Sequence, residues 1–341
     1  MYTKEKQAMK AISQYAGQRL DFVQGGGGNT SYKFDDKIMA IKASGYSLAE
    51  VEEDKGYVTV DYAALKREYD ALLTKKDADV EKESLDINLN NISLLEGMDS
   101  KRPSVEVGFH SFLKRAVVHT HSVYSNLLCC AEEGREMAKE IFGGSEYGYI
   151  YIPFINPGFE LSMHIKEECA AFERTNGKAP ELIFMESHGI VSTSDDYEEA
   201  IAIHDKANEM IIDYFGAKPF PKPKIAVACD GFVSDTPFIG EFIQAFKAGD
   251  AYFDDTILYP DQLVYLGGNL GKTIHISADD GKVTYETGMK QAKTVEEILL
   301  GVTYIISELA RSGKTLKLLC QEGVDFIRNW ESEKYRAQLV K

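Results

Sequence analysis

Two histidines separated by one residue, His119 and His121, are the first side chains in the sequence that could do metal chemistry. They end an apolar segment, 116–118, which is typical of a buried strand. Alternate residues of a strand point to the same face, so both imidazoles would face one way. Zinc binds three or four ligands of this kind. The spacing suits a metal pair, but it suits two structural histidines near a strand end as well.

A third nitrogen ligand could come from His188, which follows the apolar segment 182–185 and precedes Gly189. Turns at strand ends are places where functional residues gather. The other four histidines fall on predicted helices or in a predicted hairpin, where we expect them to serve packing or to lie on the surface. They are His110, His164, His204 and His275.

A carboxylate of interest, Glu106, lies three residues after Pro103. Ser104 can cap a predicted helix there, which would leave Glu106 in its first turn. This segment alone is also consistent with a glutamate that merely complements the helix dipole.

The glycine run 25–28 precedes Asn29, Thr30 and Ser31. A dinucleotide-binding motif would need GxGxxG spacing and a following helix, whereas strand-like sequence follows here. The segment 271–273 resembles the end of a P-loop, but the position of its first glycine is Leu266. A glycine-rich turn followed by amide and hydroxyl side chains can still bind an oxyanion.

The elements around these residues alternate between helix and strand up to about residue 215. The pattern predicts a helix over 3–17, strands near 32–42, 116–119 and 182–185, and a long helix over 195–214. Prolines at positions 219, 221 and 223 then interrupt the chain. We therefore predict a first domain over 1–217, which contains the candidate site residues, and a C-terminal extension over 218–341.

The extension is predicted to be a smaller α+β unit. It contains a hairpin formed by 272–277 and 282–286, and then a helix whose capping box would be Thr294 with Glu297. A charged C-terminal helix would end near Val340.

The net charge of −16 comes from 54 acidic and 38 basic residues, and the basic residues are dispersed. Such a chain repels nucleic acid and anionic membranes, so we expect neither as a partner. The N-terminus has no signal-peptide core, and the five cysteines form no CxxC pair. These features favour a cytoplasmic protein with reduced thiols.

Together these motifs resemble the class II aldolase/adducin family, over about residues 1–215. The glycine run and the C-terminal extension resemble most closely the rhamnulose-1-phosphate aldolase-like members, here without their fused dehydrogenase domain. The matching segments are Gly28-Asn29-Thr30-Ser31, Ile41-Lys42-Ala43-Ser44-Gly45, Pro103-Ser104-Val105-Glu106, His119-Thr120-His121-Ser122, Pro157-Gly158, Ser187-His188-Gly189 and Glu198-Glu199-Ala200.

The resemblance implies a three-layer α/β/α domain with a mixed, mostly antiparallel central sheet, in a homo-oligomer, with a tetramer favoured. It implies that Zn²⁺ is bound by His119, His121 and His188, and that Glu106 is the general acid/base. The phosphate of a sugar phosphate would be held by Asn29, Thr30, Ser44, Gly45 and Ser104. Two departures weaken this phosphate site: Val105 replaces a serine and Ala43 replaces a proline that are usual in the family.

The reaction that we expect is zinc-dependent aldol cleavage of a (deoxy)ketose 1-phosphate to dihydroxyacetone phosphate and an aldehyde. Such cleavage needs an electrophile to stabilise an enediolate, and a group that moves a proton. Two alternatives remain open: a pentulose-phosphate 4-epimerase or sugar-phosphate dehydratase of the same fold, and an adducin-like binding module without catalysis. Glu106 is unusual for an epimerase, whereas Lys42 slightly favours one.

Overall fold

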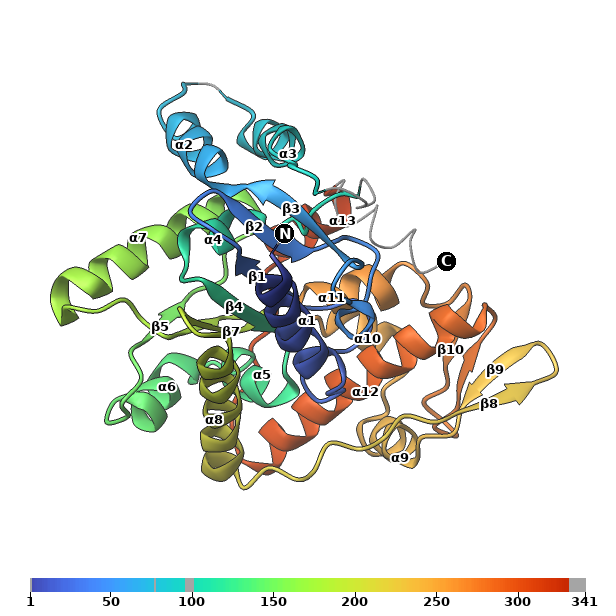
Figure 1. The fold of residues 1–341 in the computed structure, drawn as a ribbon. Helices are drawn as coiled ribbons and strands as arrows, with labels where there is room; N and C mark the ends of the chain where they lie inside the picture. The colour runs from blue at the N-terminus through green and yellow to red at the C-terminus, as the bar shows by residue number, and fades with distance from the viewer. Residues whose placement is uncertain (1, 77, 96–100, 331–341) are drawn as a thin grey trace.

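The computed structural model describes residues 2–76, 78–95 and 101–330. At the centre of this part lies a mixed sheet with the strand order β3-β2-β1-β4-β7-β6-β5 (Figure 1). Only β5 and β6 pair in parallel, so the sheet is mostly antiparallel, as the sequence predicted. Its strands are β1 (Asn29–Lys33), β2 (Ile38–Lys42), β3 (Tyr57–Asp61), β4 (Ala116–Thr120), β5 (Tyr149–Ile152), β6 (Leu182–Met185) and β7 (Gly189–Ser194).

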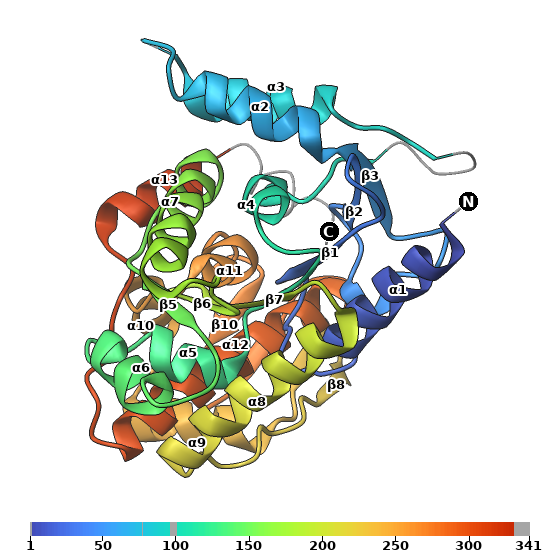
Figure 2. The same cartoon turned by 60° about the vertical axis from the view of Figure 1, so that its left-hand side comes forward.

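Helices cover both faces of this sheet and form the predicted three layers (Figure 2). Both faces need a cover because both carry apolar side chains. Along β4, Ala116 and Val118 belong to the apolar cluster on one face, whereas Val117 belongs to the cluster on the other. The first face is covered by α1 (Thr3–Gly17), α5 (Val123–Cys129) and α8 (Tyr197–Phe215), and the second by α4 (Val107–Phe112) and α7 (Phe159–Asn176).

Two further helices, α2 (Tyr62–Leu72) and α3 (Val80–Asn90), pack on each other and project beyond the β3 edge of the sheet (Figure 1). The short helix η1 (Leu48–Glu50) packs on α1, and α6 (Gly134–Phe142) packs on α5.

The C-terminal part is a smaller α+β unit with its own four-stranded sheet, in the order β10-β11-β9-β8. The strands are β8 (Ile225–Ala228), β9 (Gly231–Ser234), β10 (Ile274–Ile276) and β11 (Val283–Tyr285). The helical elements are α9 (Pro237–Phe246), α10 (Asp250–Asp255), α11 (Pro260–Gln262), the π-helical turn η2 (Leu263–Gly267), α12 (Met289–Arg311) and α13 (Gln321–Asn329).

This C-terminal part shares a core with the first. Helix α12 packs against α5, and its buried residues continue the apolar cluster that covers the first face of the large sheet. The proline-containing segment 217–224 runs between the two parts without helix or strand, as predicted. The division into domains at residue 217 stays a prediction.

Two predicted helix starts are wrong. Helix α12 begins at Met289 with Gly288 as its N-cap, so Thr294 lies inside the helix and cannot form the predicted capping box. Helix α4 begins only at Val107, so Ser104 is not its cap and Glu106 takes the N-cap position. The predicted end of the last helix near Val340 lies outside the described residues.

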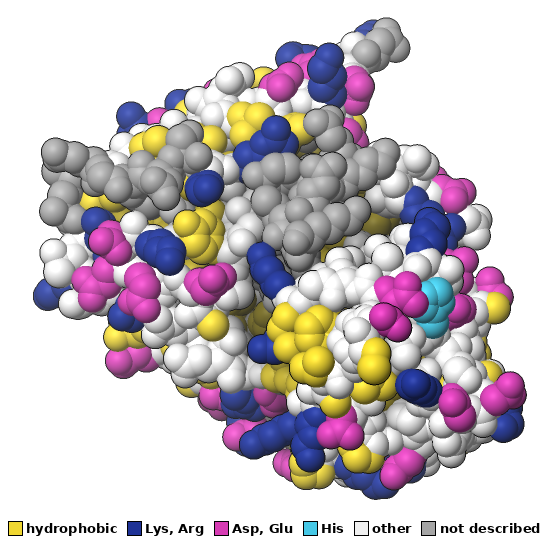
Figure 3. Space-filling view, turned by 90° about the vertical axis from the view of Figure 1, so that its right-hand side faces the viewer, with side chains coloured by type: hydrophobic (Ala, Val, Ile, Leu, Met, Phe, Trp, Pro, Cys, Tyr) yellow, Lys and Arg dark blue, Asp and Glu magenta, His cyan; other side chains and the backbone are white. Residues whose placement is uncertain are grey.

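On the described part of the face drawn in Figure 3, Lys and Arg side chains alternate with Asp and Glu side chains. Among the described residues, no helix combines the length and the apolar character that a membrane span requires.

Candidate metal centre and its pocket

Three histidines that are far apart in the sequence meet at one end of the large sheet. His119 and His121 leave the end of β4, and His188 lies in the turn between β6 and β7. One nitrogen from each imidazole lies within 4.8 Å of the other two. All three side chains are buried. The structure thus brings together the three residues predicted as metal ligands, in a group that could hold a metal ion.

Close backbone approach shapes this end of the sheet. A Cβ atom at Gly189 would lie 2.3 Å from the Thr120 carbonyl oxygen, and one at Gly28 would lie 2.7 Å from that of His119. Ser187, directly before His188, has a φ of 51°, in the left-handed region that costs a non-glycine residue energy. The turn that presents His188 therefore depends on glycines and on one strained residue.

The hydrogen bonds of His119 and His121 turn two ring nitrogens toward each other. His119 Nδ1 donates to the Ile190 carbonyl oxygen at 3.0 Å, and His121 Nδ1 lies 2.5 Å from Asp261 Oδ2. The two Nε2 atoms lie 3.1 Å apart. If each Nδ1 carries the proton that it donates, both Nε2 lone pairs point to the same place. A cation placed there would relieve their repulsion, so this donor set fits a metal such as zinc.

Burial also keeps His119 in the protonation state that metal binding requires. It lowers the pKa of His119 well below the usual range, so the ring is neutral at pH 7. Metal-binding imidazoles must be in this neutral form.

Glu106 lies beside the three histidines. Its Oε1 is 3.1 Å from His188 Nε2, and its Oε2 is 3.4 Å from His119 Nε2. Burial would raise the pKa of Glu106, but positive charge at His119 and His188 holds it well below the usual range. A cation bound by the neutral imidazoles would supply the same charge. Among the described atoms, its buried Oε1 has no hydrogen-bond partner. An ionised oxygen is therefore available at this centre.

A buried chain of hydrogen bonds holds Glu106 in place. The Asn29 amide nitrogen donates to Glu106 Oε2 at 2.5 Å and to Ser104 Oγ at 3.0 Å. Its amide oxygen therefore accepts from His110 Nε2, and His110 Nδ1 is left to accept from Ser31 Oγ at 2.7 Å. Burial lowers the pKa of His110 to about 3, which keeps it neutral. The sequence suggested only a packing role for His110, yet it fixes the orientation of Asn29.

An open pocket lies in front of the cluster and encloses about 1000 Å³ of atom-free space, its mouth included. The predicted residues Asn29, Ser44, Gly45 and Ser104 line it. Thr30 does not fit that prediction: its hydroxyl lies 2.6 Å from Ser13 Oγ, on the opposite side of β1 from Asn29. The prediction placed the adjacent residues Asn29 and Thr30 on one surface, whereas successive side chains of a strand point to opposite faces.

The C-terminal part supplies residues of the site that the sequence did not reveal. It contributes Pro260, Tyr265, Lys290 and Thr294 to the pocket wall. Asp261 contacts His121 behind the pocket. The resemblance of the C-terminal extension to the family subgroup indicated no role for any of these residues.

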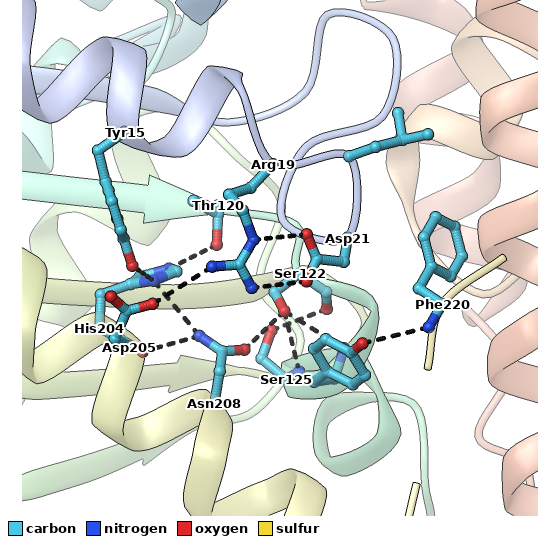
Figure 4. A network of polar contacts seen from close by, with 12 residues as sticks. Tyr15, Arg19, Asp21, Thr120, Ser122, Ser125, His204, Asp205, Asn208 and Phe220 are labelled. Carbon is cyan, nitrogen blue, oxygen red and sulfur yellow. Dashed lines mark hydrogen bonds and ion pairs between the residues drawn. The ribbon is translucent and has the colours of Figure 1, made fainter. Parts of the chain in front are cut away.

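A second polar network anchors β4 from the other face of the sheet (Figure 4). The Thr120 hydroxyl lies 2.8 Å from His204 Nε2, and Ser122 Oγ donates to Asn208 Oδ1 at 2.6 Å. Tyr15 of α1 lies 3.1 Å from His204 Nδ1. Thr120 and Ser122 alternate with the two histidines, so these bonds hold the backbone that presents them.

Part of this chain matches known proteins. Residues 7–210 match the model of the "Class II Aldolase and Adducin N-terminal domain". A Bacillus subtilis (strain 168) protein described as "Uncharacterized oxidoreductase YuxG" is 33% identical to this chain over a region that covers 58% of this chain and 30% of that protein. The chain thus matches less than a third of the length of that relative.

Two solved structures resemble this chain at low sequence identity. An N-terminal class II aldolase domain from Thermoplasma acidophilum is 22% identical with a TM-score of 0.49, and the match covers 60% of this chain and 91% of that one. An L-fuculose-1-phosphate aldolase from Thermus thermophilus is 14% identical with a TM-score of 0.40, covering 63% and 95%. The family match spans more than half of the chain, and by it this chain belongs to the class II aldolase and adducin family.

Proposed function

We propose that this protein is a zinc-dependent carbon–carbon lyase that cleaves a (deoxy)ketose 1-phosphate to dihydroxyacetone phosphate and an aldehyde. The observation that carries the proposal is the convergence of three buried imidazoles with an ionised carboxylate at an open pocket. A binding module without catalysis has no need of such a group.

His119, His121 and His188 would hold the zinc ion. Bound there, Zn²⁺ acts as a Lewis acid that stabilises negative charge developing on substrate oxygens. Three neutral ligands leave its full positive charge for that task.

Glu106 would move the proton. Cleavage removes a proton from the hydroxyl on the carbon that becomes the aldehyde, and the carbon released from it must gain one. A single carboxylate can accept the first proton and return it as the second. Asn29 and Ser104 keep Glu106 in position, because the Asn29 amide nitrogen donates to both.

The phosphate would lie at the other side of the pocket, near the Ser44-Gly45 turn. Gly45 has a φ of 91°, which only glycine adopts readily, and Ser44 Oγ donates to the Pro103 carbonyl oxygen at 3.0 Å. Lys42 and Lys290 also line the pocket and add positive charge. In a chain with a net charge of −16, an anionic substrate needs such a local group of donors.

The test combines metal analysis of the purified protein with cleavage assays on a panel of ketose 1-phosphates and the corresponding free sugars. We expect one zinc per chain and release of dihydroxyacetone phosphate from at least one phosphorylated sugar. Bound zinc without any cleavage would favour an epimerase or dehydratase instead. A protein without zinc and without turnover would contradict both and favour the binding module. The expected homo-oligomer, with a tetramer favoured, stays a prediction that sedimentation can check.

A further inference from the structure

One buried hydrogen bond links the C-terminal part to the candidate metal centre. Asp261 Oδ2 lies 2.5 Å from His121 Nδ1, and the two residues are 140 positions apart in the chain. Asp261 is 1% exposed and His121 is 4% exposed. The family match ends at residue 210, so this carboxylate lies outside the matched region.

The glycine run makes this contact possible. A Cβ atom at Gly27 would lie 2.4 Å from Asp261 Oδ2 and 2.9 Å from His121 Nδ1. A Cβ atom at Gly26 would lie 2.5 Å from the Tyr265 hydroxyl. Two consecutive glycines therefore leave the space that residues of the C-terminal part occupy.

A further contact fixes the same docking. The backbone nitrogen of Gly25 donates to Glu297 Oε2 of α12 at 2.8 Å. The C-terminal part is thus held against the glycine run by this bond as well as by the Asp261–His121 pair.

The chemistry of the pair is that of a carboxylate behind a metal-binding histidine. By accepting a hydrogen bond from Nδ1–H, Asp261 Oδ2 fixes the tautomer in which the lone pair of His121 is on Nε2. That Nε2 is the atom that faces His119. Carboxylates in this position also orient the ring and make the ligand more basic.

We propose that Asp261 is a positioning residue of the metal centre, through which the C-terminal part completes the site. The proposal rests on the proposed function in one respect: the three histidines must bind zinc. A buried hydrogen bond that only holds the two parts together would affect folding stability and leave the affinity for zinc unchanged.

The experiment measures zinc affinity by competition with a chromophoric chelator, using the full chain after its metal has been removed. In Asp261→Ala we expect the affinity to fall by about 10- to 100-fold, the usual effect of removing such a partner. The amide oxygen of Asp261→Asn can still accept a hydrogen bond from Nδ1–H but carries no charge, so we expect a loss of about fivefold.

A matched control comes from another buried carboxylate of the same part. Glu296 accepts hydrogen bonds from Ser234 Oγ at 2.8 Å, from Thr236 Oγ1 at 2.5 Å and from Tyr285. We expect Glu296→Gln to lower the melting temperature and to bind zinc as the wild type does.

The outcomes distinguish a failure of the positioning role from a failure of the proposed function. If the wild type binds zinc and a folded Asp261→Ala variant binds it within twofold as tightly, Asp261 has no positioning role, while the proposed function is untouched. If the alanine variant does not fold, the asparagine variant decides by the same twofold limit. A wild type that binds no zinc would overturn the positioning role together with the proposed metal centre.

Discussion

The two parts of the molecule reach the same pocket in different ways. The first part supplies His119, His121, His188 and Glu106 from strand ends, a turn and a helix start. The C-terminal part supplies Lys290 and Tyr265 to the pocket wall and Asp261 behind His121. One part thus holds the groups that we assign to the chemistry, and the other holds groups that surround them.

This difference has a physical origin. In the first part, the sheet itself fixes the site: the register pairs His119 with Asn29 on one side and with Val191 on the other. The C-terminal residues depend instead on docking against the glycine run, where any side chain would collide. Changes in the first part should therefore abolish function, and changes in the second should weaken it.

The largest effect is expected from His121→Ala, which removes one of three metal ligands. We expect this variant to lose stoichiometric zinc, because two imidazoles hold zinc far more weakly than three. Metal analysis after dialysis measures the loss. A variant that still carries one zinc per chain would contradict the metal assignment and, with it, the contrast between the two parts.

The next effect concerns Glu106→Gln, which preserves shape and removes the charge. We expect zinc to be retained and kcat to fall by about 10²-fold or more, the usual scale for a lost acid/base. Turnover with the identified substrate and the zinc content would be measured on the same sample. Near-normal turnover would show that the proton is moved by another group.

An effect of intermediate size comes from the buried network beneath β4. Burial lowers the pKa of His204 to about 3, and the charge of Arg19 acts in the same direction. In the unfolded chain the pKa of His204 is near 6.5, so as the pH falls His204 is protonated in the unfolded state before it is protonated in the folded state. Protonation of His204 therefore does not reduce the free energy of unfolding above about pH 6.5. As the pH falls from there toward 3, the folded state is progressively destabilised relative to the unfolded state.

Between pH 6.5 and 5 the loss from His204 amounts to about 2 kcal/mol at most. Urea unfolding at several pH values, with chelator present, measures it in the wild type and in His204→Gln. We expect a shallower pH dependence in the variant. Equal slopes in the two proteins would mean that His204 does not couple folding to this proton.

The sequence predicted more of the first part than of the second. Short continuous apolar runs located β4 and β6, and with them the histidines at their ends. Strand periodicity also explains the error at Thr30, since a motif read as one surface is divided between two faces of β1. Local sequence patterns were sufficient to predict site residues that lie at or next to the end of a strand.

The same local patterns failed where distant segments decide the structure. Thr294 and Glu297 have the spacing of a capping box, yet the helix begins five residues earlier and Glu297 binds the Gly25 backbone instead. Nothing near Asp261 in the sequence indicates that it meets a histidine 140 positions away. Only the packing of the whole chain brings such pairs together.

The smallest effect is expected in the C-terminal part itself, from Lys290→Ala. Lys290 lies in the first turn of α12 and lines the pocket, so its loss should weaken binding of a phosphorylated substrate. We expect KM to rise about tenfold for the phosphorylated sugar, as for one lost charged contact, with kcat nearly unchanged. The exposed Lys293, which lies further along the same helix, provides the matched control Lys293→Ala. Equal KM values for the two variants would mean that the C-terminal part encloses the pocket without recognising the anion.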